Sequence, residues 1–194
     1  MTISPSEMER LIRQAQQGDS AAVARLYELH ADMIYRYIAY RVPNEEIEDL
    51  TADVFLRMVE GLPGFRITGA PFEAWLYRIA AARIADHYRR SAQRPQVELP
   101  ESMTDHDPLP EEQLMQQQEL GLLREALQHL TDDQQTVMIL RFVERKSHEE
   151  VAQIMEKSTS NVKTIQHRAL VQLSRLLGET KKPRHYLRGR RDSQ

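Results

Sequence analysis

Residues Lys146–Leu173, KSHEEVAQIMEKSTSNVKTIQHRALVQL, decide the fold because they predict two helices joined by a short turn. Ser147 and Glu150 have the spacing of a capping box, in which each side chain accepts a hydrogen bond from the backbone N–H of the other residue. The first helix then gains a buried face from Val151, Ala152, Ile154 and Met155. The pattern breaks after Met155, and Ser158 or a neighbour caps a second helix that we expect to reach about Leu177. Together these features predict a helix-turn-helix.

The predicted second helix has two different sides. With about 100° between successive residues, its inward side consists of the apolar residues Val162, Ile165, Ala169, Leu173 and Leu176. Its outward side is cationic and rich in hydrogen-bonding groups, and it carries Ser160, Lys163, Thr164, His167, Arg168 and Val171. In a helix-turn-helix this side enters the major groove of DNA, where Lys and Arg meet phosphates and guanine edges. On this stretch alone, a solvated face on an ordinary helical hairpin remains the alternative.

The composition indicates a helical protein with one or two domains in 194 residues. Ala, Leu, Glu, Gln and Arg dominate, and alternating apolar patterns are rare, which favours α-helix throughout. There is no cysteine, so disulfides and thiolate metal sites are excluded, as suits a reducing compartment. No apolar run is long enough to span a bilayer and the N-terminus has no apolar export signal, so we expect a cytoplasmic protein without membrane insertion.

The net charge of −3 is unevenly distributed along the chain. Counting Lys and Arg against Asp and Glu, residues 1–91 carry −2, residues 92–135 carry −8 and residues 136–194 carry +7. A basic C-terminal third that contains a helix-turn-helix pattern is the charge distribution expected of a nucleic-acid-binding protein.

The N-terminal part predicts helices with clear start and stop signals. Ser4 and Pro5 begin the first helix as N-cap and first helical residue. A second helix ends at Pro43, and Asn44 caps a third, which ends at Gly61 as its C′ residue. The inward face of this third helix consists of Ile47, Leu50, Val54 and Met58.

Residues 62–71, LPGFRITGAP, predict a loop because they contain two prolines and two glycines. A helix follows from Phe72 to about Arg90. Aromatic rings interleaved with arginines suit single-stranded nucleic acid, since rings stack on unpaired bases and cations neutralise phosphates. The candidate residues are Phe65, Arg66, Arg78, Arg83, Arg89 and Arg90. The spacing of Phe72, Trp75 and Ile79 is that of core residues, and we interpret those three as core.

The remaining segments complete the domain plan. Residues 92–112 are acidic and rich in proline, which predicts a linker. Residues 113–130 predict a helix, and Thr131 with Gln134 forms a further capping box that opens a helix to Val143. Residues 179–194 form a basic tail that we expect to be disordered and available to phosphates.

Three stretches, in this order, resemble the extracytoplasmic-function (ECF) sigma factors of bacterial RNA polymerase. They are IEDLTADVFLRMVEGLPGF, FEAWLYRIAAARIADHYRR and LTDDQQTVMILRFVERKSHEEVAQIMEKSTSNVKTIQHRALVQL. The resemblance covers residues 11–177. It implies an all-α fold of two small helical domains joined by an extended linker, with residues 1–91 as sigma domain two and residues 113–178 as sigma domain four.

The resemblance also implies a function: a transcription initiation factor that binds core RNA polymerase, directs it to promoters and helps to melt them, often in a stress response. The minus-thirty-five element would be read by Ser160, Asn161, Lys163, Thr164, His167 and Arg168. The loop and arginine set given above would hold the melted minus-ten strand, and the loop would capture a flipped base. The polymerase β′ clamp helices would contact exposed members of the set Glu48, Asp49, Asp53, Phe55, Leu56 and Arg57. The other implied partners are the polymerase β flap and an anti-sigma factor.

Several positions depart from the pattern of this family. Ala81 and Ala82 stand where an Arg-Asn pair is common, and Ala52 stands where Gln is common. The turn of the helix-turn-helix has Glu156 where Gly is usual, and a non-Gly residue in a left-handed turn carries a conformational cost. These departures leave the promoter sequence open.

Two other classes of protein compete with this interpretation. A conventional helix-turn-helix regulator would use the N-terminal half as an effector or interaction domain, but such a domain does not need an aromatic and arginine-rich loop. An enzyme is the second alternative, because His148-Glu149-Glu150 begins like a zinc-protease motif. The second histidine of that motif would fall on Ala152, so the match is a coincidence. We expect no catalysis, no metal and no cofactor.

Overall fold

The computed structural model describes residues 3–93, 121 and 123–180, and its described elements are helical. The N-terminal half contains α1 (Pro5–Gln16), α2 (Ser20–Ala39), α3 (Ile47–Gly61) and α4 (Phe72–Gln93), with short 3₁₀ turns η1 (Asn44–Glu46) and η2 (Leu62–Gly64). The C-terminal half contains α6 (Asp132–Met138), a π-helical turn η3 (Ile139–Val143), α7 (His148–Met155) and α8 (Thr159–Thr180).

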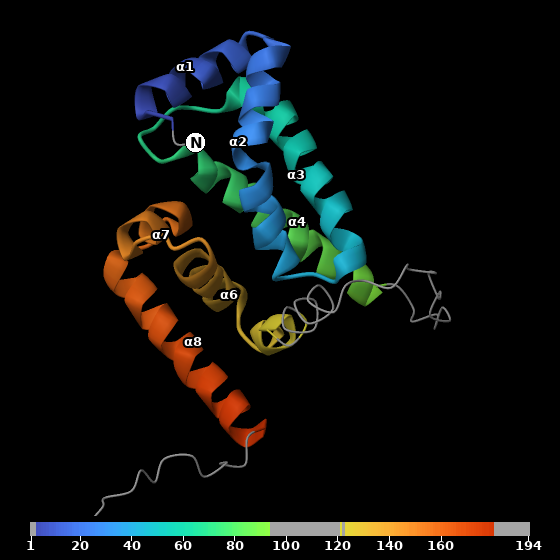
Figure 1. The fold of residues 1–194 in the computed structure, drawn as a ribbon, viewed down its shortest axis with the longest axis vertical. Helices are drawn as coiled ribbons and strands as arrows, with labels where there is room; N and C mark the ends of the chain where they lie inside the picture. The colour runs from blue at the N-terminus through green and yellow to red at the C-terminus, as the bar shows by residue number, and fades with distance from the viewer. Residues whose placement is uncertain (1–2, 94–120, 122, 181–194) are drawn as a thin grey trace, which may run out of the picture.

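The N-terminal half is a bundle in which α2 packs against α1, α3 and α4 (Figure 1). Apolar side chains at helical spacing fill its centre, and Leu26, Ile34 and Val54 are fully buried. Burial of one such side chain contributes about 1.5–3 kcal/mol to folding. Phe72 is also buried, while Trp75 and Ile79 pack partly buried against the core, which confirms the core interpretation of these residues.

Several predicted helix starts are confirmed by their hydrogen bonds. Ser4 caps α1 in a capping box with Glu7, and Pro5 is the first helical residue. Thr131 and Gln134 form the predicted capping box at the start of α6, with 2.9 Å from the Thr131 backbone N to Gln134 Oε1. The predicted helix from Thr131 to Val143 is one continuous helical stretch that widens to a π-helical turn at Ile139.

Two predicted helix boundaries were wrong. Asn44 does not cap α3, because it begins the 3₁₀ turn η1 and its side-chain oxygen accepts a hydrogen bond from Arg124 instead. Gly61 is not a left-handed C′ residue, because it closes α3 with a φ of −85°. A glycine is favoured at this position because the Trp75 ring lies close to the backbone, and a Cβ added there would lie 3.0 Å from Cζ2 of Trp75.

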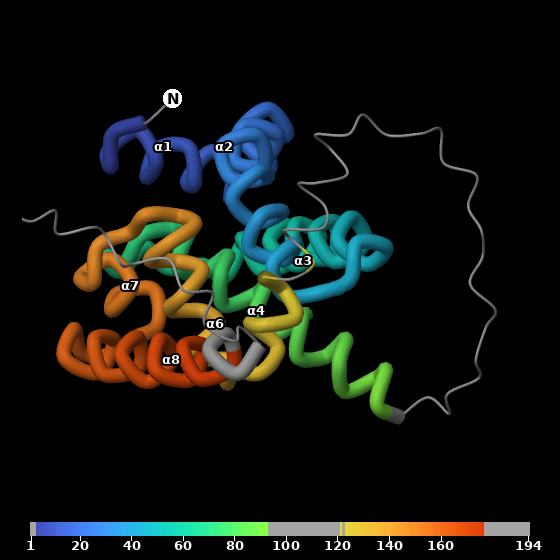
Figure 2. Tube along the Cα trace, turned by 60° about the horizontal axis from the view of Figure 1, so that its bottom comes forward, coloured from blue at the N-terminus to red at the C-terminus, as the bar shows by residue number. Residues whose placement is uncertain are grey.

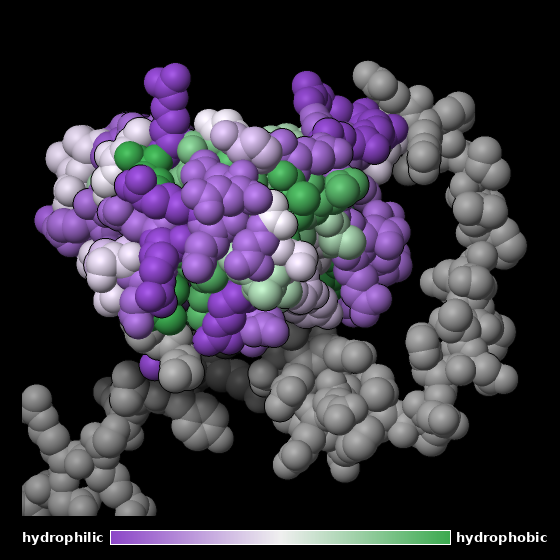
Figure 3. All heavy atoms as spheres, turned by 90° about the horizontal axis from the view of Figure 1, so that it is seen from above, coloured by the Kyte–Doolittle hydropathy of each residue, from purple (hydrophilic) through white to green (hydrophobic). Residues whose placement is uncertain are grey.

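The two halves of the chain lie side by side. The tube in Figure 2 shows α7 and α8 below α1, and α4 packs against α7. Figure 3 shows hydrophilic residues over most of one outer face of the molecule, with apolar patches between them. Most of the predicted linker 92–112, half of the predicted helix 113–130 and residues 181–194 of the predicted tail lie outside the described residues. Residues 123–128 are helical, α4 continues to Gln93 and α8 to Thr180.

Candidate nucleic-acid and polymerase interfaces

The helix-turn-helix is held by local hydrogen bonds at both helix starts. The Ser147 backbone N–H donates to Glu150 Oε2 at 2.6 Å, and the Glu150 N–H donates to Ser147 Oγ at 3.1 Å. The Ser147 backbone N–H, and then the Ser147 side chain, hold the pKa of Glu150 below its usual value by hydrogen bonding to the charged carboxylate. Ser158 caps α8, because its Oγ accepts from the Asn161 N–H at 3.2 Å. Both capping predictions are therefore confirmed.

The two faces of α8 are as the sequence predicts. Val162, Ala169 and Leu173 are buried against the rest of the C-terminal half. The six predicted outward residues are exposed, as is Asn161: Ser160, Lys163, Thr164, His167, Arg168 and Val171. The Thr164 hydroxyl donates to the Ser160 carbonyl at 3.0 Å and keeps its acceptor lone pairs toward solvent. Gln166 points inward, where its Oε1 lies 2.9 Å from His148 Nε2.

The turn between α7 and α8 contains a residue in the left-handed conformation. Glu156 has a φ of 53° and a ψ of 41°, as expected for the place that Gly usually occupies. The adjacent Lys157 pairs with Asp133 of α6 at 3.2 Å. The Glu156 carboxylate forms an ion pair with Arg78 of α4, in the other half of the chain.

The loop 65–71 is fixed to the bundle rather than free in solvent. Gln16 Nε2 donates to the carbonyls of Leu62 and Phe65 at 3.0 and 2.8 Å. Phe65 is half-buried, and its ring centroid lies 5.2 Å from that of Phe72 and 4.7 Å from that of Trp75. The candidate residue Phe65 is therefore packed against the bundle, with part of its ring covered by Phe72 and Trp75. The loop instead borders an apolar cavity of about 300 Å³, lined by Met8, Ile12, His30, Phe65, Ile67 and Phe72 among others.

The predicted arginine set divides into paired and exposed members. Arg83 is the clearest correction, because its side chain is only 13% exposed and pairs with Asp53 at 3.1 Å and with Asp86. Arg89 also pairs with Asp86, and its hydrogen bond holds the pKa of that carboxyl below its usual value. Arg66 and Arg90 are exposed, and neither has an ion pair within the described part of the chain.

The predicted polymerase-binding set on α3 is exposed with two exceptions. Glu48, Asp49, Leu56 and Arg57 face solvent, and Leu56 is 56% exposed although it is apolar. Asp53 is half-buried by its pairs with Arg57 and Arg83. Phe55 is a correction: it is 6% exposed and packs edge-on against Tyr27, with ring centroids 4.7 Å apart. At the inner side of α3, the ring belongs to the core.

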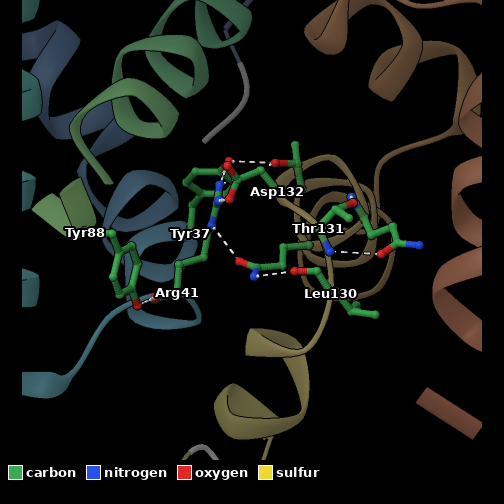
Figure 4. Close-up of polar contacts among 9 residues, drawn as sticks. Tyr37, Arg41, Tyr88, Leu130, Thr131 and Asp132 are labelled. Carbon is green, nitrogen blue, oxygen red and sulfur yellow. Dashed lines mark hydrogen bonds and ion pairs between the residues drawn. The ribbon is translucent and has the colours of Figure 1, made fainter. Parts of the chain in front are cut away.

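A polar cluster between the two halves was not predicted from the sequence (Figure 4). Arg41, at the end of α2, is 3% exposed, and its guanidinium donates to Asp132 Oδ1 at 2.7 Å and to Gln135 Oε1 at 3.0 Å. The same group donates to the Tyr37 hydroxyl at 2.7 Å, which lies 3.0 Å from Thr136 Oγ1. No periodicity points to such a cluster, because its members lie more than 90 residues apart.

Two absences hold for the described residues. Within them, no group of three or more His, Cys, Asp or Glu side chains is placed to hold a metal ion. No helix among those described is long and apolar enough to cross a membrane.

Known proteins match this chain in both halves. Residues 26–94 match the family model of Sigma-70 region 2, and residues 126–175 match that of Sigma-70 region 4. The chain is 36% identical over 175 residues to the ECF RNA polymerase sigma factor BldN of Streptomyces coelicolor. The aligned region covers 89% of this chain and 66% of BldN. It is 33% identical over 181 residues to the ECF RNA polymerase sigma factor SigD of Mycobacterium tuberculosis. This aligned region covers 89% of this chain and 85% of SigD.

The fold is also similar to a solved structure. CnrH, solved in complex with the cytosolic domain of CnrY, is 24% identical with a TM-score of 0.66, over 88% of this chain and 97% of that one. The similarity supports the all-α arrangement of two helical regions.

Proposed function

The chain belongs to the ECF sigma factors of RNA polymerase, and on that premise we propose how its residues divide the work of promoter recognition. The protein is a transcription initiation factor that binds core RNA polymerase and promoter DNA. Its domains follow the plan in the sequence: residues 1–91, a linker over 92–112, and residues 113–178. It acts in the cytoplasm without catalysis of its own.

The outward face of α8 reads the minus-thirty-five element as duplex DNA. The observation that supports this role is the exposure of Lys163, His167 and Arg168, which form no ion pair with the other described residues. Their cationic groups are therefore available to phosphates and base edges, while the apolar side of the same helix fixes its orientation. Ser160, Asn161 and Thr164 add hydrogen-bonding groups to the same face.

The loop 65–71 and α4 hold the melted minus-ten strand. Arg66 and Arg90 are exposed and unpaired among the described residues, so they are the first candidates for phosphates. Arg78 and Arg89 also bind phosphates once they have released the carboxylates of Glu156 and Asp86. Arg83 instead stabilises the packing of α4 on α3 through its ion pair with Asp53. The apolar cavity beside the loop has room for an unstacked base, and the Phe65 ring forms part of its wall.

The exposed side of α3 binds the β′ clamp helices of the polymerase. Leu56 and Val59 are 56% and 45% exposed, and the acidic residues Glu48 and Asp49 lie at the start of the same helix. An exposed apolar pair with nearby charges suits a protein interface. The C-terminal half contacts the β flap. An anti-sigma factor that covers these surfaces is the expected regulator.

Run-off transcription with purified core polymerase and a promoter library tests this function. We expect initiation from a defined subset of promoters, and loss of most of it in Leu56→Arg, which places a charge in the proposed clamp contact. Arg25→Leu, at a partly exposed position of α2 where the arginine pairs with Glu28, is the surface control and should initiate normally. No initiation from any promoter, or equal activity of Leu56→Arg and wild type, would refute the assignment.

A further inference from the structure

The end of α2 and the first turn of α6 form a polar contact between the two halves of the chain, in which the Arg41 side chain is buried and the Asp132 side chain is 79% exposed. Arg41 is buried, yet its guanidinium has partners on both sides of the contact: Tyr37 in its own helix, and Asp132, Gln135 and Thr136 in α6. A buried cation needs a full set of acceptors, because transfer of an unpaired charge from water is costly. Arg41 obtains its only anionic partner in the described structure from Asp132, so it depends on α6 for neutralisation.

Further contacts surround this central one. Arg36 forms a two-point ion pair with Glu144, with Nε–Oε1 and Nη2–Oε2 both at 2.9 Å, and the Glu144 side chain is only 7% exposed. Lys146 pairs with Glu73 of α4 at 2.8 Å. Arg124 donates to the Ala39 carbonyl at the end of α2 at 2.7 and 2.9 Å. The contact is therefore predominantly polar and charged, and it is sensitive to competing ions.

This contact covers one face of α4. A cavity of about 160 Å³ between the halves is lined by Tyr77, Arg78 and Ala81 of α4 and by Ile154 and Met155 of α7. The Tyr77 hydroxyl is buried without a hydrogen-bond partner, so the closed arrangement leaves one polar group unsatisfied. The outward face of α8 and the exposed side of α3 are left open to solvent.

Glu156 extends the contact to Arg78, one of the proposed ligands of the melted strand. A left-handed Glu carries a conformational cost that Gly would avoid, so its side chain needs a separate explanation. Its carboxylate forms an ion pair with Arg78, and on the proposed role of α4 a DNA phosphate would bind the same guanidinium. The two anions therefore compete for the same guanidinium.

We propose that this chain inhibits its own binding of single-stranded DNA. The Arg41–Asp132 contact holds the C-terminal half over α4, and Glu156 pairs with Arg78 in place of a phosphate. The inference rests on the proposed role of α4 in binding the melted strand. In the closed state the chain still presents α3 to polymerase and α8 to duplex DNA, but it masks the surface for single-stranded DNA. Opening exchanges intramolecular ion pairs for contacts with phosphates.

Fluorescence energy transfer in the full chain tests the closure. The protein has no cysteine, so Ala24→Cys in α2 and Ser174→Cys in α8 provide two unique and exposed labelling sites. Asp132→Asn removes the anionic partner of Arg41. Asp133→Asn is the matched control, because it makes the same change one residue later, where the carboxylate pairs with Lys157 inside the C-terminal half.

We expect high transfer in the wild type and in Asp133→Asn at low salt, and low transfer in Asp132→Asn. Binding of a randomised single-stranded DNA pool should tighten about tenfold in Asp132→Asn, since one charge-assisted contact is lost from the closed state. Glu156→Gly provides a second variant that removes the left-handed strain and should fold at least as stably. It should tighten single-strand binding about threefold, because both side chains of the Arg78–Glu156 pair are exposed, whereas Arg41 in the other pair is buried.

Low transfer in the wild type, or identical transfer in the two Asp variants, would overturn the closure. Opening without any gain in single-strand binding by either variant would overturn the masking of α4. If those variants also failed to initiate transcription with core polymerase, the proposed function would be the part that fails. If the variants initiated transcription but their energy transfer equalled that of the wild type, the proposed function would be supported and the autoinhibition would be refuted.

Discussion

Ser147 and Glu150 exchange two hydrogen bonds, 2.6 Å and 3.1 Å long, and these bonds determine where the first helix of the helix-turn-helix begins. The pair fixes the start of α7, whose buried residues Val151 and Ile154 hold it against the rest of the C-terminal half. Because α8 follows within a few residues, the same pair also contributes to the orientation of the proposed DNA-reading face.

Ser147→Ala should lower the free energy of unfolding by about 1 kcal/mol, because the N–H groups at the start of α7 lose a capping acceptor. Urea denaturation followed by circular dichroism measures this change. Ser174→Ala is the control, since Ser174 is exposed in the interior of α8 and the substitution should be neutral or slightly stabilising. Equal effects of the two substitutions would show that the capping box contributes nothing to stability.

His30 should make the stability of the protein depend on pH below neutrality. Burial lowers the pKa of His30 from its ordinary value of 6.5, although a hydrogen bond to the Leu26 carbonyl and the nearby Glu73 oppose the shift. The unfolded chain therefore binds a proton near pH 6.5 that the folded chain does not bind until lower pH. This contribution to stability is fully present above pH 6.5 and is lost as pH falls from there to the pKa of the folded state.

Thermal unfolding of wild type and His30→Gln between pH 7.5 and pH 5 checks this expectation. Gln retains a donor for the Leu26 carbonyl but does not titrate, so the variant should lose less stability than the wild type over the interval. His167→Gln, at an exposed position on α8, should keep the slope of the wild type. Parallel curves for all three proteins would show that His30 is not the group responsible.

Gly69 should tolerate substitution less well than Gly64 in the same loop region. Gly69 has a φ of +82°, whereas Gly64 does not have a positive φ, and a Cβ would meet nothing within 4 Å at either position. Gly69→Ala should therefore cost about 1–2 kcal/mol through the backbone alone, and Gly64→Ala should cost little. Single-strand binding should weaken only in Gly69→Ala, since the loop shape changes there. A matching loss in both variants would indicate a different cause.

The proposed readout by α8 separates into phosphate and base contacts. Lys163 lies early in the helix, where a flexible ammonium reaches the DNA backbone. Lys163→Ala should therefore weaken binding to all promoters and reduce the slope of log K against log salt concentration by about one unit. Arg168 lies further along with a planar guanidinium that suits guanine. Arg168→Ala should cost about 1–3 kcal/mol and relax base preference at one minus-thirty-five position. Filter binding over a salt series, on a promoter library, distinguishes the two. Unchanged salt slopes and base preferences in both variants would exclude α8 from DNA.

The sequence predicted those features that depend on neighbouring residues. The capping pairs at Ser4, Thr131 and Ser147 were recognisable because both partners lie within one helical turn. The two faces of α8 followed from its period, and the left-handed Glu156 from the place of the turn. Such features need only local geometry, which a motif specifies almost completely.

Features that depend on tertiary packing were beyond a reading of single stretches. Phe55 lies one residue before the exposed Leu56, and its ring is covered in the bundle, where it packs against Tyr27 of α2. Arg83 was interpreted as a phosphate ligand, although Asp86, three residues on in α4, is a partner that helical spacing indicates. Only its second pair, with Asp53 of α3, depends on packing between helices. The Arg41 cluster joins residues 91 and more positions apart, and no motif connects them.

The separation of Arg41 and Asp132 by 91 residues also has a consequence in time. A ribosome that adds about 5–20 residues each second needs roughly 5–18 s to reach Asp132 after it has made Arg41. Once α4 has been made, and until α6 has followed and left the exit tunnel, α4 exists without the segment that covers it. A nascent chain is therefore open by necessity, and a polymerase that meets it during synthesis encounters α4 uncovered. The time since a molecule was translated therefore determines whether its C-terminal half already covers α4.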